Sequence, residues 1–100
     1  MTVYVVGQLK FTDLAAYERY TAHFRGVLKQ FGGTLLAADG KPEIIEGRWD
    51  RDKIVLLSFS DATAFRGFYE SVQYQEIAKD RKAGADTLML LVHGIDGGGG

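Results

Sequence analysis

The chain has 100 residues, of which 46% are hydrophobic and 25% are charged, a composition typical of one soluble globular domain. The formal net charge of −1 gives no electrostatic reason to expect a nucleic acid or an anionic membrane as a partner. The sequence contains no cysteine, which excludes disulfides, thiol catalysis and cysteine-ligated metal sites. Because it shows neither a signal-peptide pattern nor an apolar run near the ~20 residues of a transmembrane helix, we expect a cytoplasmic protein.

A strand is predicted for Thr2–Leu9, and a long helix follows it. Thr12 or Asp13 is suited to the N-cap of this helix, since a short polar side chain accepts a hydrogen bond from the first helical turn. Apolar residues then recur at steps of three and four up to Phe31, which is the spacing of an amphipathic helix. Gly32-Gly33 ends the helix because glycine readily adopts the left-handed conformation of a C-terminal cap.

The middle of the chain is predicted to be extended. Thr34–Ala38 has the composition of a strand, a polar turn follows at residues 39–42, and Glu43–Trp49 is a further extended piece. Gly47 inside that piece indicates a bulge or a bend. After another polar turn, Lys53–Phe59 is predicted as the next strand.

The C-terminal half repeats the pattern of the N-terminal half. Phe59-Ser60-Asp61 resembles Phe11-Thr12-Asp13, and it likewise precedes a helical run of apolar residues. A second helical stretch is predicted around residues 74–82, with Ser71 as its expected N-cap. The last predicted strand is Asp86–Gly94, so the chain ends on the same kind of element with which it begins.

The predicted order is β-α-β-β-α-β, which is the ferredoxin-like arrangement of an α+β protein. Right-handed crossovers place both helical units on one face of a four-stranded antiparallel sheet. We expect one domain at residues 1–96, followed by a flexible glycine tail at residues 97–100.

Three of the predicted strands are apolar on both faces. In the last strand, Leu88 and Leu90 alternate with Met89 and Leu91. Because side chains alternate across a strand, such a pattern predicts burial on both sides of the sheet. The two helical units can cover only one side. We therefore expect the other side to pack against a second copy of the chain, which gives a homodimer of the dimeric α+β barrel type.

Several motifs occur in the order and spacing of a known family. Glu46-Gly47-Arg48-Trp49 matches an E-G-x-W pattern. Phe68-Tyr69-Glu70-Ser71, followed by Tyr74-Gln75, matches W-Y-x-S-x-x-Y-Q. The other matching positions are Gly33, Gly40, Phe59-Ser60 and Arg81. On these residues the chain resembles the DUF1330 family of the dimeric α+β barrel superfamily. Phe68 stands where the family usually has tryptophan, Val72 where it often has proline, and residues 50–53 replace a proline-containing turn with arginine.

The resemblance implies the ferredoxin-like fold and leaves the activity open. Relatives in the superfamily include cofactor-free monooxygenases, isomerases, lyases and haem-dependent enzymes, and a shared fold does not choose among them. We expect no cofactor for this chain. Its two histidines lack the spacing of a metal site, so we expect no metal either.

Glu46 and His93 are the candidate catalytic residues. Glu46 could accept a proton beside an aromatic wall formed by Trp49, or it could pair with Arg48 or Arg81. His93 lies in the last predicted strand, in phase with apolar residues, where it could act as a general base or bind haem. The alternative is a hydrogen-bonded histidine near the end of the strand.

The candidate ligand-binding residues are Tyr17, Tyr20, Trp49, Tyr69, Tyr74 and Arg81. Tyr17, Tyr20 and Tyr69 lie on predicted helix faces that meet the sheet, where their hydroxyls could surround a pocket, and pockets of the superfamily lie in the same place. Tyr74 is suited to a lid, and Arg81 to a clamp for a carboxylate. Trp49 could instead anchor the interface between subunits.

These residues favour a protein that binds a small aromatic or lactone-like metabolite. The chemistry implied by the resemblance is that of a cofactor-independent monooxygenase, isomerase or lyase. The alternative is a non-catalytic binding or assembly module, in which the polar groups are paired with one another. In that case Phe24, Phe65 and Phe68 would fill the space between the helices and the sheet.

Overall fold

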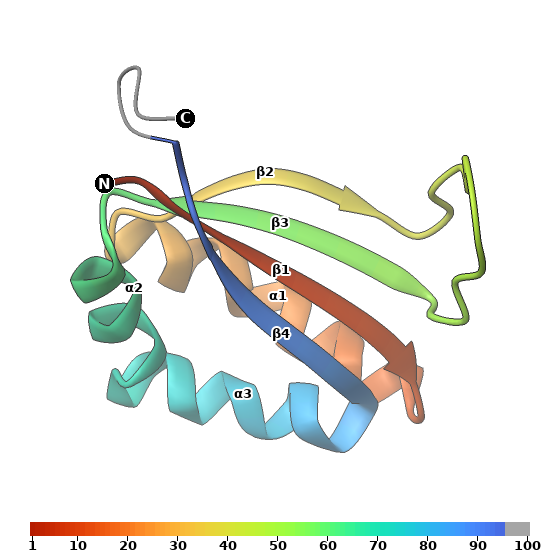
Figure 1. The fold of residues 1–100 in the computed structure, drawn as a ribbon. Coiled ribbons are helices and arrows are strands. Elements are labelled where there is room, and N and C mark those ends of the chain that lie inside the picture. Colours follow the sequence, from red (N-terminus) through yellow and green to blue (C-terminus); the bar gives the residue numbers. More distant parts are fainter. Residues whose placement is uncertain (96–100) are drawn as a thin grey trace.

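The computed structural model describes residues 1–95, so the predicted glycine tail lies outside the described residues. The elements in chain order are β1 (Val3–Phe11), α1 (Leu14–Gln30), β2 (Thr34–Asp39), β3 (Lys53–Phe59), α2 (Ala62–Tyr69), α3 (Val72–Gly84) and β4 (Ala85–His93) (Figure 1). This is the predicted ferredoxin-like order, with the second helical unit divided into α2 and α3.

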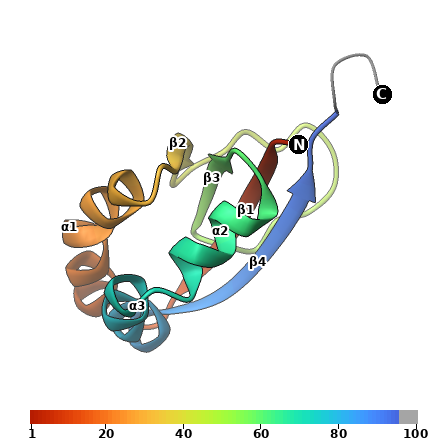
Figure 2. The ribbon, with the colours of Figure 1, turned by 90° about the vertical axis from the view of Figure 1, so that its left-hand side faces the viewer.

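The four strands form one antiparallel sheet in the order β2-β3-β1-β4. The central strand β1 pairs with β3 on one side and with β4 on the other, so Val5 lies opposite both Leu57 and Leu91. α1, α2 and α3 all cover the same side of this sheet (Figure 2). The predicted arrangement of helices on a single face is therefore confirmed.

The helix starts follow from the repeated sequence pattern. The carboxylate of Asp13 accepts a hydrogen bond from the backbone N–H of Ala16, and that of Asp61 accepts one from Ala64. Each aspartate thus satisfies one of the N–H groups that a helix leaves free at its N-terminus. The Ser71 hydroxyl does the same for α3. At the other end of α1, Gly32 has φ +76°, the left-handed conformation expected there.

Residues 40–52 form an irregular loop, which differs from the extended piece expected at Glu43–Trp49. In the described residues β3 pairs with β2 and with β1, so both of its edges are occupied, and residues 40–52 do not pair with the free edge of β2 or β4 either. Gly47, at φ +89°, bends the loop as its position in the sequence indicated. The loop projects beyond the edge of the sheet (Figure 1).

The hydrophobic core lies between the sheet and the helices. The strands contribute buried residues from one alternating set, among them Val3, Val5 and Leu9 of β1. The helices contribute aromatic rings, such as Phe68 at 5.3 Å and Phe65 at 5.5 Å between ring centroids from Phe59 of β3. Aromatic residues therefore dominate the layer that faces the sheet.

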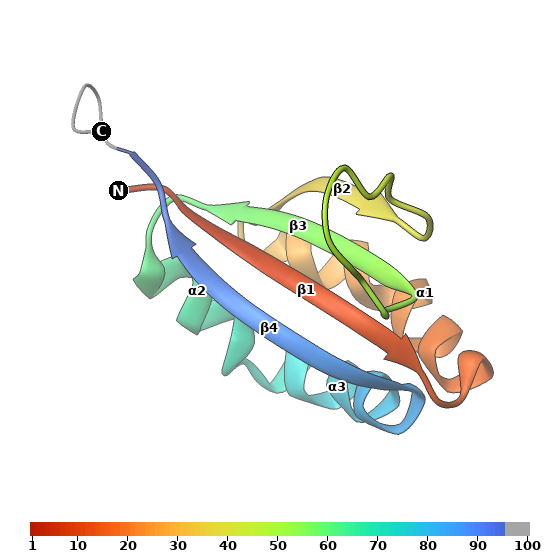
Figure 3. The same ribbon diagram turned by 45° about the vertical axis from the view of Figure 1, so that its right-hand side comes forward.

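The opposite side of the sheet carries no helix (Figure 3). We call it the open face, and it includes Tyr4 of β1 and Leu88, Leu90 and Val92 of β4, whose exposed fractions are 38%, 42%, 47% and 46%. An apolar surface of this kind is unusual for a monomer in water. Within residues 1–95, no helix is both long and apolar enough to cross a membrane.

Candidate functional site

A cavity of about 230 Å³ lies between the sheet and the helices. An engineered cavity of about 150 Å³ is enough to hold benzene, so this volume suits an aromatic ring with substituents. The aromatic residues that line the cavity are Tyr17, Tyr20, Phe24, Phe65, Phe68 and Tyr74. The floor is the helix-facing side of the sheet, with Val5 and Leu9 of β1 and Val55 and Leu57 of β3.

The charged residues that line the cavity are all basic. They are Arg25 of α1, Lys53 of β3 and Arg81 of α3, and none of the described residues on the cavity wall is an aspartate, a glutamate or a histidine. The whole chain, by contrast, has a net charge of −1. The cavity wall thus carries three basic groups and no acidic one, and it favours a negatively charged occupant.

Arg81 is the most buried of these groups, with 6% of the residue exposed. Its Nε donates a hydrogen bond to the hydroxyl of Tyr74 at 3.2 Å, and that hydroxyl lies 3.0 Å from the hydroxyl of Tyr20. Within residues 1–95, no acidic side chain forms an ion pair with Arg81. A buried guanidinium normally has a carboxylate partner, so this arrangement leaves positive charge available inside the protein.

The surroundings of Arg81 keep it charged and keep Tyr20 neutral. Burial opposes its charge, but Tyr74, through charge and a hydrogen bond, together with Tyr20 and Tyr69, raises the pKa of the guanidinium overall. Burial, followed by the nearby Tyr74, raises the pKa of Tyr20 well above its ordinary value of 10.0. Tyr20 is thus a neutral phenol at pH 7 and supplies no counter-charge.

Tyr17 lies beside Lys53, one of the two better exposed basic groups. The Lys53 ammonium lies over its ring, 5.0 Å from the centroid, which is the geometry of a cation–π contact. Burial, and then the nearby Tyr74, raises the pKa of Tyr17 to about 12. Burial, and then the charge of Arg25, lowers the pKa of Lys53. Both shifts reflect a site that is partly shielded from water and contains no carboxylate.

The predicted ligand-binding residues separate into two groups. Tyr17, Tyr20, Tyr74 and Arg81 come together at the cavity. Tyr69 packs against Tyr74, with 5.5 Å between ring centroids, and lines with Arg81 a shallower depression beside β4. Tyr74 is buried in the cavity wall, where its ring packs against Tyr20 of α1 and Phe68 of α2, and its role as a lid remains a prediction.

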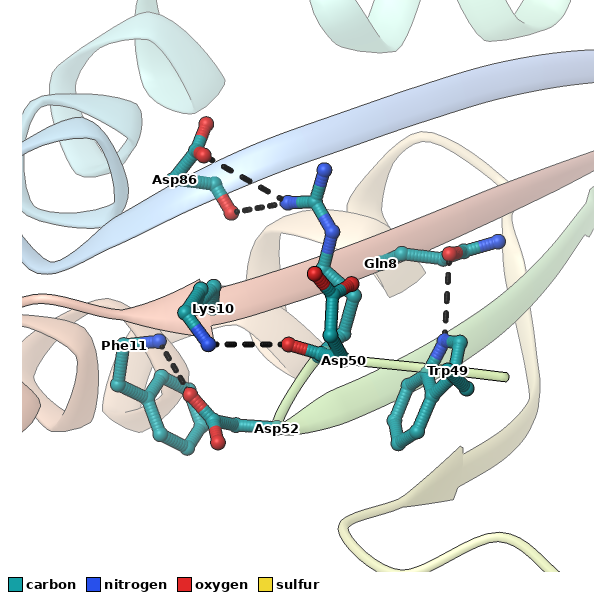
Figure 4. A network of polar contacts seen from close by, with 8 residues as sticks. Gln8, Lys10, Phe11, Trp49, Asp50, Asp52 and Asp86 are labelled. Carbon is teal, nitrogen blue, oxygen red and sulfur yellow. Dashed lines mark hydrogen bonds and ion pairs between the residues drawn. The ribbon is translucent and has the colours of Figure 1, made fainter. Parts of the chain in front are cut away.

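Trp49 lies on the open face of the sheet and does not line the cavity. Its Nε1 donates a hydrogen bond to Gln8 Oε1 at 3.3 Å (Figure 4). The same end of the loop is held to β1 by three further hydrogen bonds, from Lys10 Nζ to the Asp50 carbonyl, from the Phe11 N–H to Asp52 Oδ2 and from the Asp52 N–H to the Leu9 carbonyl. The loop 40–52 is therefore anchored across the open face at its C-terminal end.

The two predicted catalytic residues also lie away from the cavity. Glu46 is exposed in the loop 40–52, and within residues 1–95 it forms no ion pair with Arg48 or Arg81. His93 lies opposite Val3 at the end of β4 and is exposed, whereas the cavity is bounded further along the sheet, where Leu9 lies opposite Thr87. Their catalytic roles remain predictions, and neither group contacts the cavity within one protomer.

Arg25, Lys53 and Thr87 are among the cavity residues that were not singled out from the sequence. Lys53 and Thr87 both alternate in phase with apolar residues of their strands, and a polar residue in that phase is a signal that could have been used. Arg25 follows the core residue Phe24 and carries no such signal. The Thr87 hydroxyl is buried and has no hydrogen-bond partner among the described residues. Within residues 1–95 there is also no cluster of acidic or histidine side chains suited to a metal.

Comparison with known proteins identifies the family and the fold. The family model described as a domain of unknown function (DUF1330) matches residues 2–95. A protein of unknown function from Rhodopseudomonas palustris superposes with a TM-score of 0.81 at 15% sequence identity, over 96% of this chain and 84% of that chain. No functionally curated protein matches the sequence.

Two other solved structures extend the comparison. A dimeric ferredoxin-like protein of unknown function from Jannaschia sp. CCS1 superposes with a TM-score of 0.74 at 16% identity, covering 94% of this chain and 100% of that chain. SnoaB, a cofactor-independent oxygenase from Streptomyces nogalater, superposes with a TM-score of 0.70 at 16% identity, covering 93% and 92%. At such low identity these similarities concern the fold alone.

Proposed function

The chain belongs to the DUF1330 family, and we propose that it binds a small aromatic acid in the cavity between its sheet and its helices. The single observation that carries this proposal is the buried guanidinium of Arg81, which has no acidic partner among the described residues and lies on an aromatic cavity wall. The other lining groups support the same class of ligand.

The carboxylate of the ligand would pair with Arg81. A guanidinium presents a planar set of donors that matches the two oxygens of a carboxylate, and such charge-assisted hydrogen bonds are about twice as strong as neutral ones. Because the Nε of Arg81 already contacts Tyr74, its terminal nitrogens are the groups left for a ligand. The ring of the ligand would then lie among the aromatic side chains of α1, α2 and α3.

The protein also forms a homodimer through the open face in this proposal. The exposed apolar residues of β1 and β4, and the dimeric state of the Jannaschia protein with the same fold, support the assembly. Native mass spectrometry at micromolar concentration tests it. We expect a dimer for the unchanged chain, a monomer for Leu90→Glu on the open face, and a dimer for the control Val72→Glu, which changes an 82% exposed residue of α3. A monomeric unchanged chain would refute the assembly.

The ligand proposal is tested by a thermal-shift screen. The purified protein is heated with aromatic acids, with neutral lactones and quinones of similar size, and with haem. Binding to the native state stabilises it by about 2.7 kcal/mol at a hundredfold excess over the dissociation constant. We expect aromatic acids to raise the melting temperature and their neutral methyl esters to do so less. A screen in which no acid stabilises the protein would contradict the proposal.

Arg81→Met is the matching variant for this screen, with Arg19→Met as its control. Arg19 is also a helical arginine, but it lies on the surface and pairs with Asp80. We expect Arg81→Met to lose the response to aromatic acids while Arg19→Met keeps it. Equal responses in the two variants would show that Arg81 does not hold the acid.

The second candidate function is a cofactor-independent enzyme that acts on the same ligand. The likeness in fold to an oxygenase of this kind supports it. The specific observation is the chain of hydrogen bonds from Arg81 through Tyr74 to Tyr20, which could stabilise a developing oxyanion at the cavity. Any acid found in the screen is therefore incubated with the protein in air, and its products are followed by mass spectrometry.

The enzyme hypothesis assigns proton transfer to Glu46 or His93. Because both are exposed outside the cavity, Glu46→Gln and His93→Gln should leave binding unchanged. Turnover lost in either variant would support the predicted catalytic role, and turnover kept in both would eliminate it. The binding or assembly module is the remaining alternative; the open space beside Phe24, Phe65 and Phe68 supports a ligand pocket over a filled core.

A further inference from the structure

We propose that the ligand carries two acidic groups, one held by Arg81 and the other by Lys53 and Arg25 at the opposite end of the cavity. This inference rests on the proposed function and names its ligand class more closely. The ligand would be a rigid aromatic dianion, such as a dicarboxylate, rather than a molecule with a single acidic group.

The two ends of the cavity are separated by the register of the sheet. Leu9 of β1 lies opposite Lys53 of β3 and opposite Thr87 of β4, so these three residues form one row across three neighbouring strands. All three side chains line the cavity. Since neighbouring strands lie about 4.8 Å apart, the outer two members of the row are about 10 Å apart at their backbones.

Each end of the row has its own arginine. Arg81 shares with Thr87 a second depression beside β4, which places the guanidinium at the β4 end. Lys53 and Arg25 both line the cavity, and burial followed by the charge of Arg25 lowers the pKa of Lys53, so we assign both basic groups to the β3 end. We place the ring of Tyr17 between the ends. It contacts Lys53, and although burial and Tyr74 raise the pKa of Tyr17 overall, the charge of Arg81 acts to lower it.

The β3 end carries positive charge that a bound anion would neutralise. Lys53 and Arg25 carry the same charge, and within residues 1–95 neither forms an ion pair with an acidic residue. Lys53 is half-buried, and its contact with the Tyr17 ring compensates only part of the cost of shielding an ammonium from water. An acidic group between Lys53 and Arg25 would remove the repulsion between the two cations.

The β4 end offers one neutral group in addition to Arg81. The Thr87 hydroxyl is buried without a hydrogen-bond partner among the described residues, and Thr87 lines the cavity. An unpaired buried hydroxyl is unfavourable, so a ligand that accepts its hydrogen bond gains affinity. The two ends therefore differ in the groups they offer: a guanidinium and a hydroxyl at one, an ammonium and a guanidinium at the other.

The experiment compares probes that differ only in the number of acidic groups. Isothermal titration calorimetry at pH 7 measures the affinity of the full chain for cinnamate and 4-carboxycinnamate, and for 2-naphthoate and 2,6-naphthalenedicarboxylate. Because a hydrogen bond to a charged group is worth roughly a factor of ten or more in affinity, we expect each dianion to bind at least about tenfold more tightly than its monoanion.

Variants assign the gain to particular residues. Lys53→Met should remove the advantage of the dianion and leave the affinity for the monoanion within about threefold, whereas Arg81→Met should weaken both probes by about tenfold or more. Lys29→Met is the matched control, since Lys29 is an exposed lysine of α1 that does not line the cavity. If Lys53→Met does not fold, Arg25→Met replaces it, because the Arg25 side chain is exposed at the cavity rim.

The outcomes distinguish this inference from the function on which it rests. Equal affinity for monoanions and dianions, or an advantage that survives both Lys53→Met and Arg25→Met, overturns the two-ended ligand and leaves the aromatic acid proposal standing. Failure of every probe to bind the unchanged chain, with a normal circular dichroism spectrum, overturns both. A dianion advantage that depends on Lys53 or Arg25 supports both.

Discussion

Replacing Tyr74 by phenylalanine removes the hydroxyl that joins Arg81 to Tyr20 while keeping the ring in place. In the native protein this hydroxyl accepts a hydrogen bond from Arg81 Nε at 3.2 Å and lies 3.0 Å from the Tyr20 hydroxyl. Tyr74, Tyr20 and Arg81 are all buried. The substitution therefore leaves two buried polar groups without their partner, not one.

The magnitude follows from that count. Each buried group that loses its partner costs about 1–3 kcal/mol, so Tyr74→Phe is expected to lower the free energy of unfolding by about 2–6 kcal/mol. Tyr20→Phe leaves the bond between Arg81 and Tyr74 intact, and it should cost only about 1 kcal/mol. In the double variant the Tyr20 hydroxyl is absent, so it cannot be left without a hydrogen-bond partner. The loss of unfolding free energy in the double variant should therefore be smaller than the sum of the two single losses.

Urea unfolding of the ligand-free protein measures all three costs. The fluorescence of Trp49, the single tryptophan of the chain, and circular dichroism should report the same transition. A cost of Tyr74→Phe equal to that of Tyr20→Phe, or additive costs in the double variant, would refute the reasoning. Either result would mean that water in the cavity replaces the lost hydroxyl, and that Arg81 does not depend on the tyrosine pair.

The remaining predictions concern packing, pH and salt. Gly84→Ala should destabilise the protein by about 1–3 kcal/mol in the same urea assay, because the added Cβ would meet the backbone of Tyr17 and lie 2.7 Å from the Asp13 carbonyl oxygen. Gly26→Ala, in α1 with nothing within 4 Å, should instead stabilise it by about 0.5–1 kcal/mol, and a loss there would contradict the packing described for α1. The pKa of Tyr17 is about 12 in the folded state against 10.0 ordinarily, so the unfolded chain loses this proton at lower pH than the folded protein does. The stability that Tyr17 contributes is therefore lost as pH rises from about 10 to about 12. A Tyr17→Phe variant that loses as much stability over this range would disprove the assignment. Binding of an aromatic acid should weaken with added sodium chloride, since it depends on charge, and salt-independent calorimetric affinities would argue against a role for Arg81.

The overall fold could be predicted because its signals are local. Asp13 and Asp61 mark two helix starts within repeated three-residue patterns, and the alternation of apolar residues marks the strands. The apolar open face was likewise visible in the alternation along β4. These features depend on residues that are neighbours along the chain, so they can be predicted from the sequence alone.

The candidate site could be predicted only in part. The tyrosines of α1 and α3 were expected at a pocket because they lie on the faces of helices that meet the sheet, and the structure brings Tyr17, Tyr20 and Tyr74 to one cavity. Glu43–Trp49 was expected to be extended but lies in the irregular loop 40–52, since strand composition does not show whether a segment will pair with a neighbouring strand. The positions of Glu46 and Trp49 depend on that loop.

What the sequence determined by itself was the order of elements, the side of the sheet that the helices cover and the apolar character of both sheet faces. Tertiary structure alone decided which polar and charged side chains come together at the cavity. Lys53 and Thr87 flank Leu9 only through the register of three strands, and Arg81 is linked to Tyr20 through Tyr74 only because α3 packs beside α1. Secondary structure follows from periods of two and 3.6 residues, whereas contacts between distant residues depend on register and packing that no local pattern encodes.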